Sequence, residues 1–372
     1  MHVRRRPRVV DVINTDWSAR ELLDHRVRQV NESGRYSNEI LCAGSEHLEG
    51  LRAQGHTVHD VAVPRGVSPL GMWRAIRAAQ RIFEERQIDI VHVHGTTAWV
   101  VGAVAAKLAD VPVVVAQVHG FHHHDNMKPW VRRAVVLCER VLCNLADRLL
   151  YQNHSDIETC QRQRLAPNRK NRLIGNGVQL KSFPVLAPPN GDPAVVLCVS
   201  RLEPVKNLGM LIEAARILRD RGCRFVVRVV GEGHLRGELE AQVARAELGD
   251  RVELLGYRTD VPALTAAADV CALVSLKEGL PRAIIEAGAC ARPIVATDVV
   301  GNRDAVVHGE TGFLVPLGDA EALADRLAQL IEGKQLRQRM GEAGRAHAET
   351  YFDEERITDR ILDIYDDALA RH

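Results

Sequence analysis

The sequence predicts an α/β protein made of two doubly wound domains, each with a parallel sheet between layers of helices. Short apolar runs alternate with helical patterns along nearly the whole chain, which is the arrangement of βαβ units. Several of these runs, such as VVVAQV at 113–118, are continuously apolar, as expected for strands that helices cover on both faces. The length of 372 residues suits two domains of ordinary size better than one.

The first half contains six candidate strands separated by helical patterns. We expect strands at residues 9–13, 39–43, 57–63, 90–93, 113–118 and 148–152, with helices that include 69–85 and 97–108. Each of these helices lies between two consecutive strands, so that it can serve as the crossover of a βαβ unit.

The second half repeats this plan after a linker. The segment KSFPVLAPPNGDP at 181–193 is dense in Pro and Gly, which favours a connection between domains. We therefore predict a first domain at 1–180 and a second at 190–351. The second is expected to hold strands at 195–200, 225–230, 252–255, 270–273, 293–297 and 312–315, and helices at 208–220, 234–248, 261–267, 282–289 and 320–332.

Composition excludes several classes of protein. The formal net charge is +1 and aromatic residues make up 4%, and neither value suits a protein that binds a nucleic acid duplex or stacks bases. Eight Cys lack the spacing of metal ligands or of a disulfide framework, which fits a reducing cytoplasm. The N-terminal MHVRRRPRVVDVIN has no long apolar stretch, so we expect neither a signal peptide nor a membrane span there.

Charge is distributed unevenly between the two halves. Residues 1–170 contain 24 Lys and Arg against 18 Asp and Glu, whereas residues 171–372 contain 25 against 30. A basic first half is suited to sit on anionic lipid or to receive an anionic acceptor. Ordinary surface variation explains the same numbers equally well.

Two cations flank the turn in SRLEPVKNLGMLIEA, residues 200–214. Arg201 follows a predicted strand at once, and Lys206 comes shortly before a predicted helix. A helix N-terminus already favours an anion, and a guanidinium fork with a mobile ammonium suits a diphosphate better than a carboxylate. The alternative is a pair of solvated surface cations.

Two acidic residues stand out in KEGLPRAIIEAGA, residues 277–289. Glu278 follows a predicted strand, and Glu286 lies inside an otherwise apolar helix that Pro281 can open at its first turn. A buried carboxylate needs partners, and the hydroxyls of a sugar or ribose can supply them. Gly279 lets the backbone approach a ligand closely. The alternatives are a solvated loop charge for Glu278 and an N-cap or salt-bridge role for Glu286.

Taken in order, these segments resemble the retaining glycosyltransferases of family 4. SRLEPVKNLGMLIEA is similar to the phosphate-binding turn of that family, and EGLPRAIIEAGACARPIVAT to its acidic donor motif with two Glu eight residues apart. IGNGV, VVGEGHLRGELE, RVELLGY and VVHGETGFLVP agree as well, and IDIVHVHG and VPVVVAQVHGF resemble the family's acceptor-domain strands. The resemblance covers nearly the whole chain.

The resemblance implies a GT-B fold, in which two Rossmann-like domains enclose an interdomain cleft. It implies that the first domain binds the acceptor, with the C-terminal helix at 352–372 crossing back to it, and that the second binds a nucleotide sugar. It also implies a cytoplasmic hexosyltransferase without cofactor or metal, and leaves attachment to the inner face of the membrane open. The implied donor is a UDP-sugar, and the implied acceptor is a glycan, lipid-linked or small-molecule acceptor, most similar to those of surface polysaccharide biosynthesis.

Site residues are carried over by position. Arg201 and Lys206 would hold the diphosphate, Glu286 the ribose, and Glu278 the transferred sugar together with the backbone of Gly279 and Leu280. Tyr257 and Arg258 would lie near the base, and His119 would face the transferred sugar. The implied catalytic residues are thus His119, Arg201, Lys206 and Glu278, and the implied acceptor residues are Asn14, His94 and His122.

Some features depart from the family pattern. The loop NTDWSARELL after the first strand lacks the usual glycines, so that Asn14, Thr15 and Ser18 are alternative ligands for phosphate or acceptor. Adjacent His residues in GFHHHDNMK, 120–128, have poor metal spacing, and an acceptor-lining loop or an exposed loop fits better. His92 and His94 should point to one side of their strand; His94 would then approach the acceptor or be structural.

Three other functions stay open from the sequence. A UDP-sugar 2-epimerase shares the two-domain arrangement, but no pair of acid–base carboxylates is evident beyond the donor motif. A non-catalytic partner that binds nucleotide sugar is disfavoured by the intact Arg201, Lys206, Glu278 and Glu286. Glycosylation of a small-molecule natural product is the third alternative.

Overall fold

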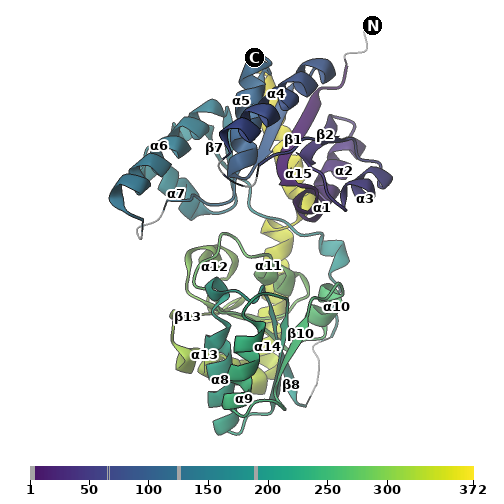
Figure 1. Cartoon of the computed structure of the whole chain (residues 1–372). Helices are drawn as coiled ribbons and strands as arrows, with labels where there is room; N and C mark the ends of the chain where they lie inside the picture. Colours follow the sequence, from purple (N-terminus) through teal and green to yellow (C-terminus); the bar gives the residue numbers. More distant parts are fainter. Residues whose placement is uncertain (1–4, 65, 67, 124–126, 188–191) are drawn as a thin grey trace. The chain divides into compact units, whose positions relative to one another are not determined.

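The computed structural model describes residues 5–64, 66, 68–123, 127–187 and 192–372, and the chain divides into two compact units (Figure 1). The first unit comprises residues 1–174 together with 355–372, and the second comprises 175–354. Each unit contains one parallel sheet covered by helices. The predicted class of two doubly wound α/β domains is therefore confirmed.

The first unit is built on a seven-stranded parallel sheet with the order β3-β2-β1-β4-β5-β6-β7. Its strands are β1 (Arg8–Thr15), β2 (Ser37–Ala43), β3 (Val58–Asp60), β4 (Ile90–His94), β5 (Val113–Val118), β6 (Arg148–Tyr151) and β7 (Asn171–Leu173). Its helices are α1 (Asp16–Leu22), α2 (Asp24–Glu32), α3 (Leu48–Ala53), α4 (Pro69–Arg86), α5 (Thr96–Leu108), α6 (Pro129–Leu145), α7 (His154–Arg162) and α15 (Glu354–Leu369), with a 3₁₀ turn at Asn168–Lys170.

Apolar side chains cover both faces of this sheet. On one face, β1 and β4 to β6 pack against α4, α5 and α6 in a cluster that includes Phe83 and Trp99. On the other face, Ile361 and Tyr365 of α15 pack with Val30 of α2 against the strands. Figure 1 shows α15, in yellow, beside the strands of this sheet. The end of the chain therefore completes the core of the first unit.

The second unit contains a six-stranded parallel sheet with the order β10-β9-β8-β11-β12-β13. Its strands are β8 (Ala194–Val199), β9 (Phe225–Val230), β10 (Val252–Gly256), β11 (Val270–Leu273), β12 (Ile294–Thr297) and β13 (Gly312–Val315). Its helices are α8 (Leu208–Asp220), α9 (Arg236–Arg245), α10 (Val261–Ala266), α11 (Arg282–Ala289), α12 (Val300–Ala305), α13 (Ala320–Glu332) and α14 (Lys334–Tyr351), with 3₁₀ turns at Leu180–Ser182 and Pro204–Lys206.

Both sheets have a point at which the strand order reverses. In the first sheet the chain moves outward from β1 to β3 and then returns to place β4 beside β1. In the second sheet it moves from β8 to β10 and then returns to place β11 beside β8. Ligands of open parallel sheets bind beyond the carboxyl ends of the strands at such a point. The loops after β1, β4, β8 and β11 are therefore the first places to look for a site.

Candidate active site

An ion pair joins the two loops at the reversal point of the second sheet. Lys206 ends the short 3₁₀ turn between β8 and α8, and Glu278 lies in the loop between β11 and α11. Lys206 Nζ lies 2.5 Å from Glu278 Oε1, and both side chains are largely buried. The backbone N–H of Leu276 also donates to the carbonyl of Val205 at 2.8 Å. The structure thus brings together two residues that were predicted from segments 72 positions apart.

Arg201, the second predicted cation, lies in a different environment. Its side chain is 69% exposed, and it pairs with Glu203 two residues away at 2.6 Å. Lys206 is thus not the solvated cation of the alternative interpretation, whereas Arg201 lies at the surface. An exposed guanidinium on a loop is free to turn toward an incoming anion, at the cost of its pair with Glu203.

The loop that carries Glu278 approaches another backbone closely. A Cβ atom built on Gly301, in the first turn of α12, would lie 2.0 Å from the carbonyl oxygen of Gly279. Only glycine at position 301 lets α12 approach this loop. A Cβ atom on Gly279 itself would meet no described atom within 4 Å. One side of the Gly279 backbone therefore faces open space, as the predicted contact with a ligand requires, while Leu280 is buried.

Glu286 lies on α11 among apolar neighbours. Its side chain is 15% exposed, and Arg282 Nε lies 3.5 Å from its Oε1. Burial raises the pKa of the Glu286 carboxyl above its ordinary value, and the positive Arg282 offsets only part of this effect. One weak ion pair leaves most of the acceptor capacity of this carboxylate available to a ligand.

Tyr257 and Arg258 follow β10, the strand at the edge of the second sheet. Tyr257 is 70% exposed. Arg258 forms a two-pronged ion pair with Asp260, with N–O distances of 2.8 and 2.7 Å. These two residues lie two strands away from β8 in the sheet order, and their predicted contact with the base stays a prediction.

The first unit contains a cavity of about 770 Å³ beyond the ends of β1, β4 and β5. Three predicted site residues line it, namely Asn14, His119 and His122. Its other walls are largely apolar and come from α4, α5, α6 and the loop after β5, with Met72, Trp99, Phe121 and Leu142. These apolar residues were not predicted as site residues, because no local pattern separates them from core positions.

His119 follows β5 and receives a hydrogen bond from a residue that follows β6. The side-chain nitrogen Nε2 of Gln152 lies 3.1 Å from His119 Nδ1. The protein that surrounds the ring lowers the pKa of His119, and the nearby His94 and Arg26 lower it further. The imidazole is therefore neutral near neutral pH, although the residue has exposed surface. Gln152 was not predicted as a site residue.

The glycine-poor segment after β1 forms no loop, because α1 begins directly after the strand. Thr15 is the N-cap of α1 and accepts a hydrogen bond from the backbone N–H of Ser18. Asn14 Oδ1 accepts from the backbone N–H of Ala98 at 3.0 Å and from the hydroxyl of Thr97 at 3.1 Å. The side-chain oxygen of Asn14 therefore holds the start of α5, while Thr15 and Ser18 bond to each other.

His94 belongs to a buried polar network beneath the cavity. Its Nε2 lies 2.7 Å from Asp11 Oδ1, and Arg26 donates to the same oxygen. The rings of His92 and His94 contact each other at a tilt of 41° with centroids 4.3 Å apart, so both point to one side of β4 as predicted. Their pKa values are lowered by burial and by neighbouring positive charge. His94 is buried and does not line the cavity, and its contact with an acceptor stays a prediction.

Asp11, His92 and His94 are also the one group of described residues with the spacing of metal ligands. Arg26 is bonded to the Asp11 oxygen that would face the ion and lies 3.0 Å from His94 Nε2. A divalent cation would have to displace this guanidinium. The donor set therefore favours a buried ion pair over a metal.

A buried carboxylate shapes the wall of the cavity. Glu139 on α6 accepts from the backbone N–H of His122 at 2.7 Å and lies 2.6 Å from His123 Nδ1. It thus holds the loop that carries His122 against α6. His124, the last residue of the His run, lies outside the described residues. No signal in the sequence links Glu139 to this loop.

Both halves of the chain match models of known protein families. Residues 162–347 match the family model described as glycosyl transferases group 1, and residues 17–177 match the glycosyl transferase 4-like domain. A relative from Escherichia coli, UDP-Gal:alpha-D-GlcNAc-diphosphoundecaprenol alpha-1,3-galactosyltransferase, is 30% identical over 320 residues, covering 82% of each chain. The capsular polysaccharide biosynthesis glycosyltransferase CapM of Staphylococcus aureus is 24% identical, covering 89% of this chain and 90% of its own.

Solved structures share the same fold over the full length. HepE from Anabaena in complex with UDP has a TM-score of 0.82 and 22% identity, with 98% of this chain and all of that chain covered. The sucrose-phosphate synthase of Thermosynechococcus elongatus has a TM-score of 0.80 and 20% identity, with 99% and 100% covered. These neighbours confirm the predicted GT-B fold, with its two Rossmann-like domains.

Proposed function

Since this chain belongs to the group 1 glycosyl transferases and is a GT4-type glycosyltransferase of the hexosyltransferase class, we propose its reaction in detail. It transfers a sugar from a UDP-sugar to a lipid-linked glycan acceptor in the assembly of a surface polysaccharide, with retention of the anomeric configuration. The second unit binds the donor and the first unit binds the acceptor.

The observation that carries the donor site is the Lys206–Glu278 pair at the reversal point of the second sheet. Cleavage of a sugar–phosphate bond leaves negative charge on the diphosphate and positive charge on the sugar. An ammonium beside a carboxylate offers one group for each developing charge. Fixed charges of this kind lower the barrier electrostatically without the need to reorganise solvent.

Arg201 and Glu286 complete the proposed donor site. The exposed Arg201 leaves Glu203 and closes on the diphosphate as a planar fork. Glu286 accepts hydrogen bonds from the two ribose hydroxyls, which supply the partners that its burial requires. Tyr257 and Arg258 contact the base.

The acceptor side is supported by the chemistry of the cavity. An aliphatic and aromatic wall opposite Asn14, His119 and His122 suits an acceptor with both apolar and hydroxyl faces, such as a sugar ring on a lipid diphosphate. The E. coli relative acts, by its name, on a diphosphoundecaprenol-linked sugar and uses UDP-Gal. This similarity supports both the carrier and the class of acceptor.

The proposal is tested with the full-length protein and a panel of nucleotides and UDP-sugars. We expect UDP and one or more UDP-sugars to raise the melting temperature, and slow release of UDP from the true donor without acceptor. Addition of lipid-linked acceptors should then give a glycoside whose anomeric configuration, read by NMR, equals that of the donor. An inverted product would exclude retention, and interconversion of UDP-GlcNAc with its C2 epimer would identify an epimerase instead.

A further inference from the structure

Tryptophan is unusually exposed in the first unit. Three of the four Trp side chains, Trp17, Trp73 and Trp130, are 55%, 54% and 70% exposed, and all three lie in this unit. Trp73 lies on α4 and Trp130 on α6, and both helices contribute residues to the cavity wall, as does α5, which lies between them in the chain. Large exposed aromatic side chains of this kind are typical of surfaces that contact a partner or a membrane.

Helix α6 has an apolar stripe on its solvent-facing side. Trp130, Ala134, Leu137 and Val141 are spaced by four, three and four residues and therefore lie on one face of the helix. All four are exposed, with Leu137 and Val141 at 58% and 53%. The opposite face, which includes Leu142, packs against the core. The solvent-facing side of the helix thus carries an apolar stripe beside exposed Arg133 and Arg140, whereas a surface helix normally turns mainly polar residues to solvent.

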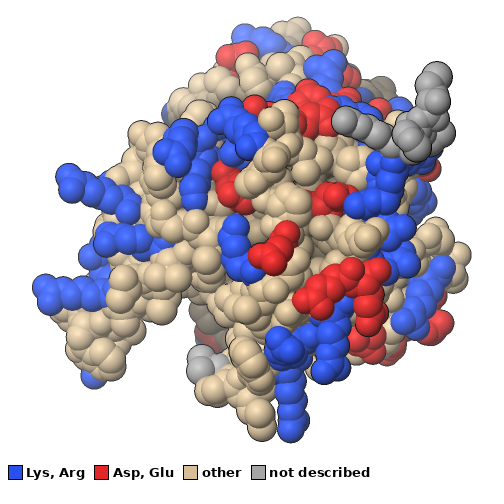
Figure 2. Space-filling view, turned by 90° about the horizontal axis from the view of Figure 1, so that it is seen from above, with Lys and Arg blue, Asp and Glu red and all other residues tan. Residues whose placement is uncertain are grey.

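Three cations beside this stripe have no acidic partner among the described residues. Lys128, Arg133 and Arg140 are exposed, and none forms an ion pair with a residue that the structure describes. The one acidic residue of α6, Glu139, is buried and bonded to the loop at His122 and His123. Figure 2 shows Lys and Arg side chains on the side of the molecule on which α6 lies in Figure 1, with little acidic surface among them.

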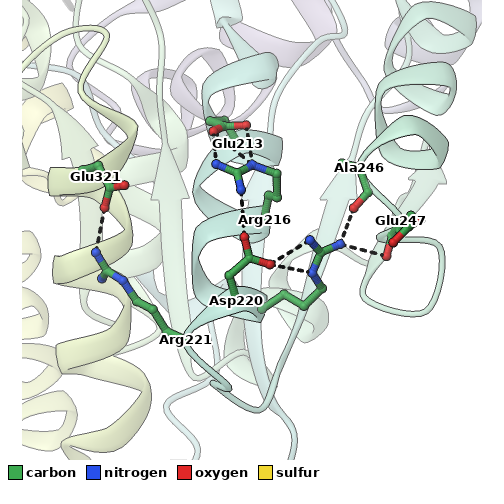
Figure 3. Close-up of polar contacts among 8 residues, drawn as sticks. Glu213, Arg216, Asp220, Arg221, Ala246, Glu247 and Glu321 are labelled. Atoms are coloured by element: carbon green, nitrogen blue, oxygen red, sulfur yellow. Dashed lines mark hydrogen bonds and ion pairs between the residues drawn. The ribbon is translucent and has the colours of Figure 1, made fainter.

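Helix α8 of the second unit and the residue that follows it show the opposite arrangement. On α8, Arg216 pairs with Glu213 and Asp220, and Arg219 pairs with Asp220 (Figure 3). Arg221 pairs with Glu321 and Asp325 of α13. Exposed Arg residues are therefore not left unpaired throughout this protein. Lys128, Arg133 and Arg140 differ from these Arg residues in having no acidic partner among the described residues.

The first turns of α4 carry the same combination. Leu70 and Trp73 are 61% and 54% exposed, and Arg77 lies 5.9 Å from the Trp73 ring centroid. Arg74 and Arg81 are exposed and form no ion pair with a described residue. Pro69 and Met72 of the same turns line the cavity.

We infer that this surface binds an anionic phospholipid bilayer. The docking surface is defined by Leu70, Trp73, Trp130, Leu137 and Val141 with the cations beside them. Trp and Leu side chains enter the boundary between headgroups and acyl chains, while Arg and Lys reach the phosphates. Basic surfaces of two copies of this chain would repel each other across a two-fold axis, which disfavours a homodimer as the occupant.

The position of the docking surface gives it a role beyond attachment. The helices that carry it also supply Met72 and Leu142 to the cavity wall. A bilayer on this surface would bring a membrane-embedded acceptor to the cavity without its lipid leaving the membrane. This step rests on the proposed lipid-linked acceptor, whereas lipid binding itself is independent of the reaction.

The test is co-sedimentation of the full-length protein with vesicles, in the absence of any substrate. We expect binding to vesicles of phosphatidylcholine with phosphatidylglycerol, and at least tenfold weaker binding to phosphatidylcholine alone. The variant Trp130→Ser/Leu137→Ser should lose tenfold or more of its affinity for anionic vesicles. Arg133→Glu/Arg140→Glu should lose about as much, and high salt should abolish the difference between the two lipid mixtures.

Matched controls separate the surface from net charge and from general hydrophobicity. Arg339→Glu/Arg360→Glu changes the net charge equally at two exposed positions away from the docking surface, and Leu317→Ser/Tyr351→Ser removes two apolar side chains of similar exposure from the second unit. Both should bind vesicles like the unmodified chain. Three outcomes would overturn the inference. The controls could lose as much vesicle binding as the docking-surface variants, or the unmodified protein could fail to bind vesicles at all. The protein could also form a stable dimer that Trp130→Ser/Leu137→Ser dissociates. Transfer to a water-soluble acceptor should persist in the docking-surface variants, so that a failed reaction and a failed docking surface give different results.

Discussion

Gln152 sets the proton on the ring of His119. Its amide nitrogen lies 3.1 Å from His119 Nδ1, and an amide NH₂ can only donate. Nδ1 must then be the acceptor, so the proton of the neutral imidazole is on Nε2. If His119 faces the transferred sugar, this tautomer presents an N–H donor to a sugar oxygen.

We expect Gln152→Glu to change the pH dependence of turnover. A carboxylate beside Nδ1 accepts instead of donating and raises the pKa of His119, which is lowered in the unmodified chain. The neutral ring of Gln152→Glu then carries its proton on Nδ1 and lacks the Nε2–H donor, so turnover should be low near neutral pH and should rise as acidification protonates the ring and restores that donor. The raised pKa places this recovery at a higher pH than the one at which the ring of the unmodified protein protonates. The pH–rate profile and the ¹⁵N shifts of His119 measure both effects.

Gln152→Leu serves as the comparison for this change. It should lower kcat because the tautomer is no longer fixed, but it should not show the recovery of activity in acid. Identical pH profiles for the unmodified chain, Gln152→Glu and Gln152→Leu would show that Gln152 does not act through His119.

Removal of either donor-site cation should depress turnover. We expect Lys206→Ala and Arg201→Ala to reduce kcat by about 100- to 1,000-fold, because each removes charge stabilisation of the departing diphosphate. Arg216→Ala on the same unit is a control, since this exposed residue pairs only with Glu213 and Asp220 among described residues. Release of UDP from the donor measures all three, and full activity of Lys206→Ala would remove the diphosphate assignment.

Stability separates the two roles of Lys206. Lys206→Ala leaves Glu278 largely buried without its cation, which should cost about 1–3 kcal/mol of unfolding free energy. The double variant Lys206→Met/Glu278→Gln removes both charges and should regain most of that stability in urea unfolding. Its activity should stay as low as that of Lys206→Ala. Recovery of activity with stability would mean that the pair is structural.

Glu286 should make the protein less stable as the pH rises. Burial raises its folded-state pKa above the ordinary 4.5, so ionisation is harder in the folded chain than in the unfolded chain. Glu286→Gln should therefore be more stable than the unmodified chain at neutral pH, and the difference should vanish as the pH falls below 4.5. The same variant should bind UDP about tenfold more weakly, because an amide is a poorer acceptor for ribose hydroxyls. Glu49→Gln, at an exposed position, should change neither quantity.

The Asp11–Arg26 pair should dominate acid sensitivity in the first unit. Burial alone would raise the pKa of Asp11, but Arg26, His94 and His92 outweigh it and hold the pKa below the ordinary 3.8. The stabilisation is then present above pH 3.8 and is lost as the pH falls from there toward the folded-state pKa. Asp11→Asn should cost about 3–5 kcal/mol at neutral pH, because Arg26 is left buried without a counter-charge.

The cost of Asp11→Asn is measured by urea unfolding at a series of pH values. The difference in unfolding free energy between Asp11→Asn and the unmodified chain should become smaller in acid. The side chain of Asp363 is 73% exposed, so Asp363→Asn should have the same unfolding free energy as the unmodified chain. A chelator should leave the unfolding free energy of the unmodified chain unchanged, since Arg26 occupies the place of an ion. A gap that is constant with pH would contradict the ion-pair assignment.

Most of the fold could be predicted from apolar runs, but helix α14 could not. The prediction for the second half placed its last helix at 320–332 and left Lys334–Tyr351 unassigned. This segment contains Gly341 and Gly344, which are unfavourable inside a helix. The structure shows the role of Gly341, since a Cβ atom at this position would lie 2.1 Å from the Ala291 carbonyl oxygen. Close packing of two backbones is a tertiary effect that no local pattern reveals.

The site residues likewise divide into those that local sequence patterns predict and those that only the structure reveals. Lys206 and Glu278 were predicted because each lies next to a strand end, in segments with a readable pattern. Gln152 and Glu139 were missed, because their partners lie 33 and 17 residues away and neither sits in a motif. Residues that orient a functional group are selected by a contact across the fold, and only the structure shows that contact.

The last helix has a consequence for biosynthesis. Tyr365 of α15 is fully buried in the first unit, where its hydroxyl lies 2.6 Å from His92 Nδ1. During synthesis on the ribosome, residues 1–174 therefore lack the helix that covers one face of their sheet. That helix becomes available only when the final residues have been made. Meanwhile the middle segment, 175–354, holds all its own strands and can fold earlier. We expect premature termination before Glu354 to expose the strand face that α15 covers and to direct the product to chaperones or proteases.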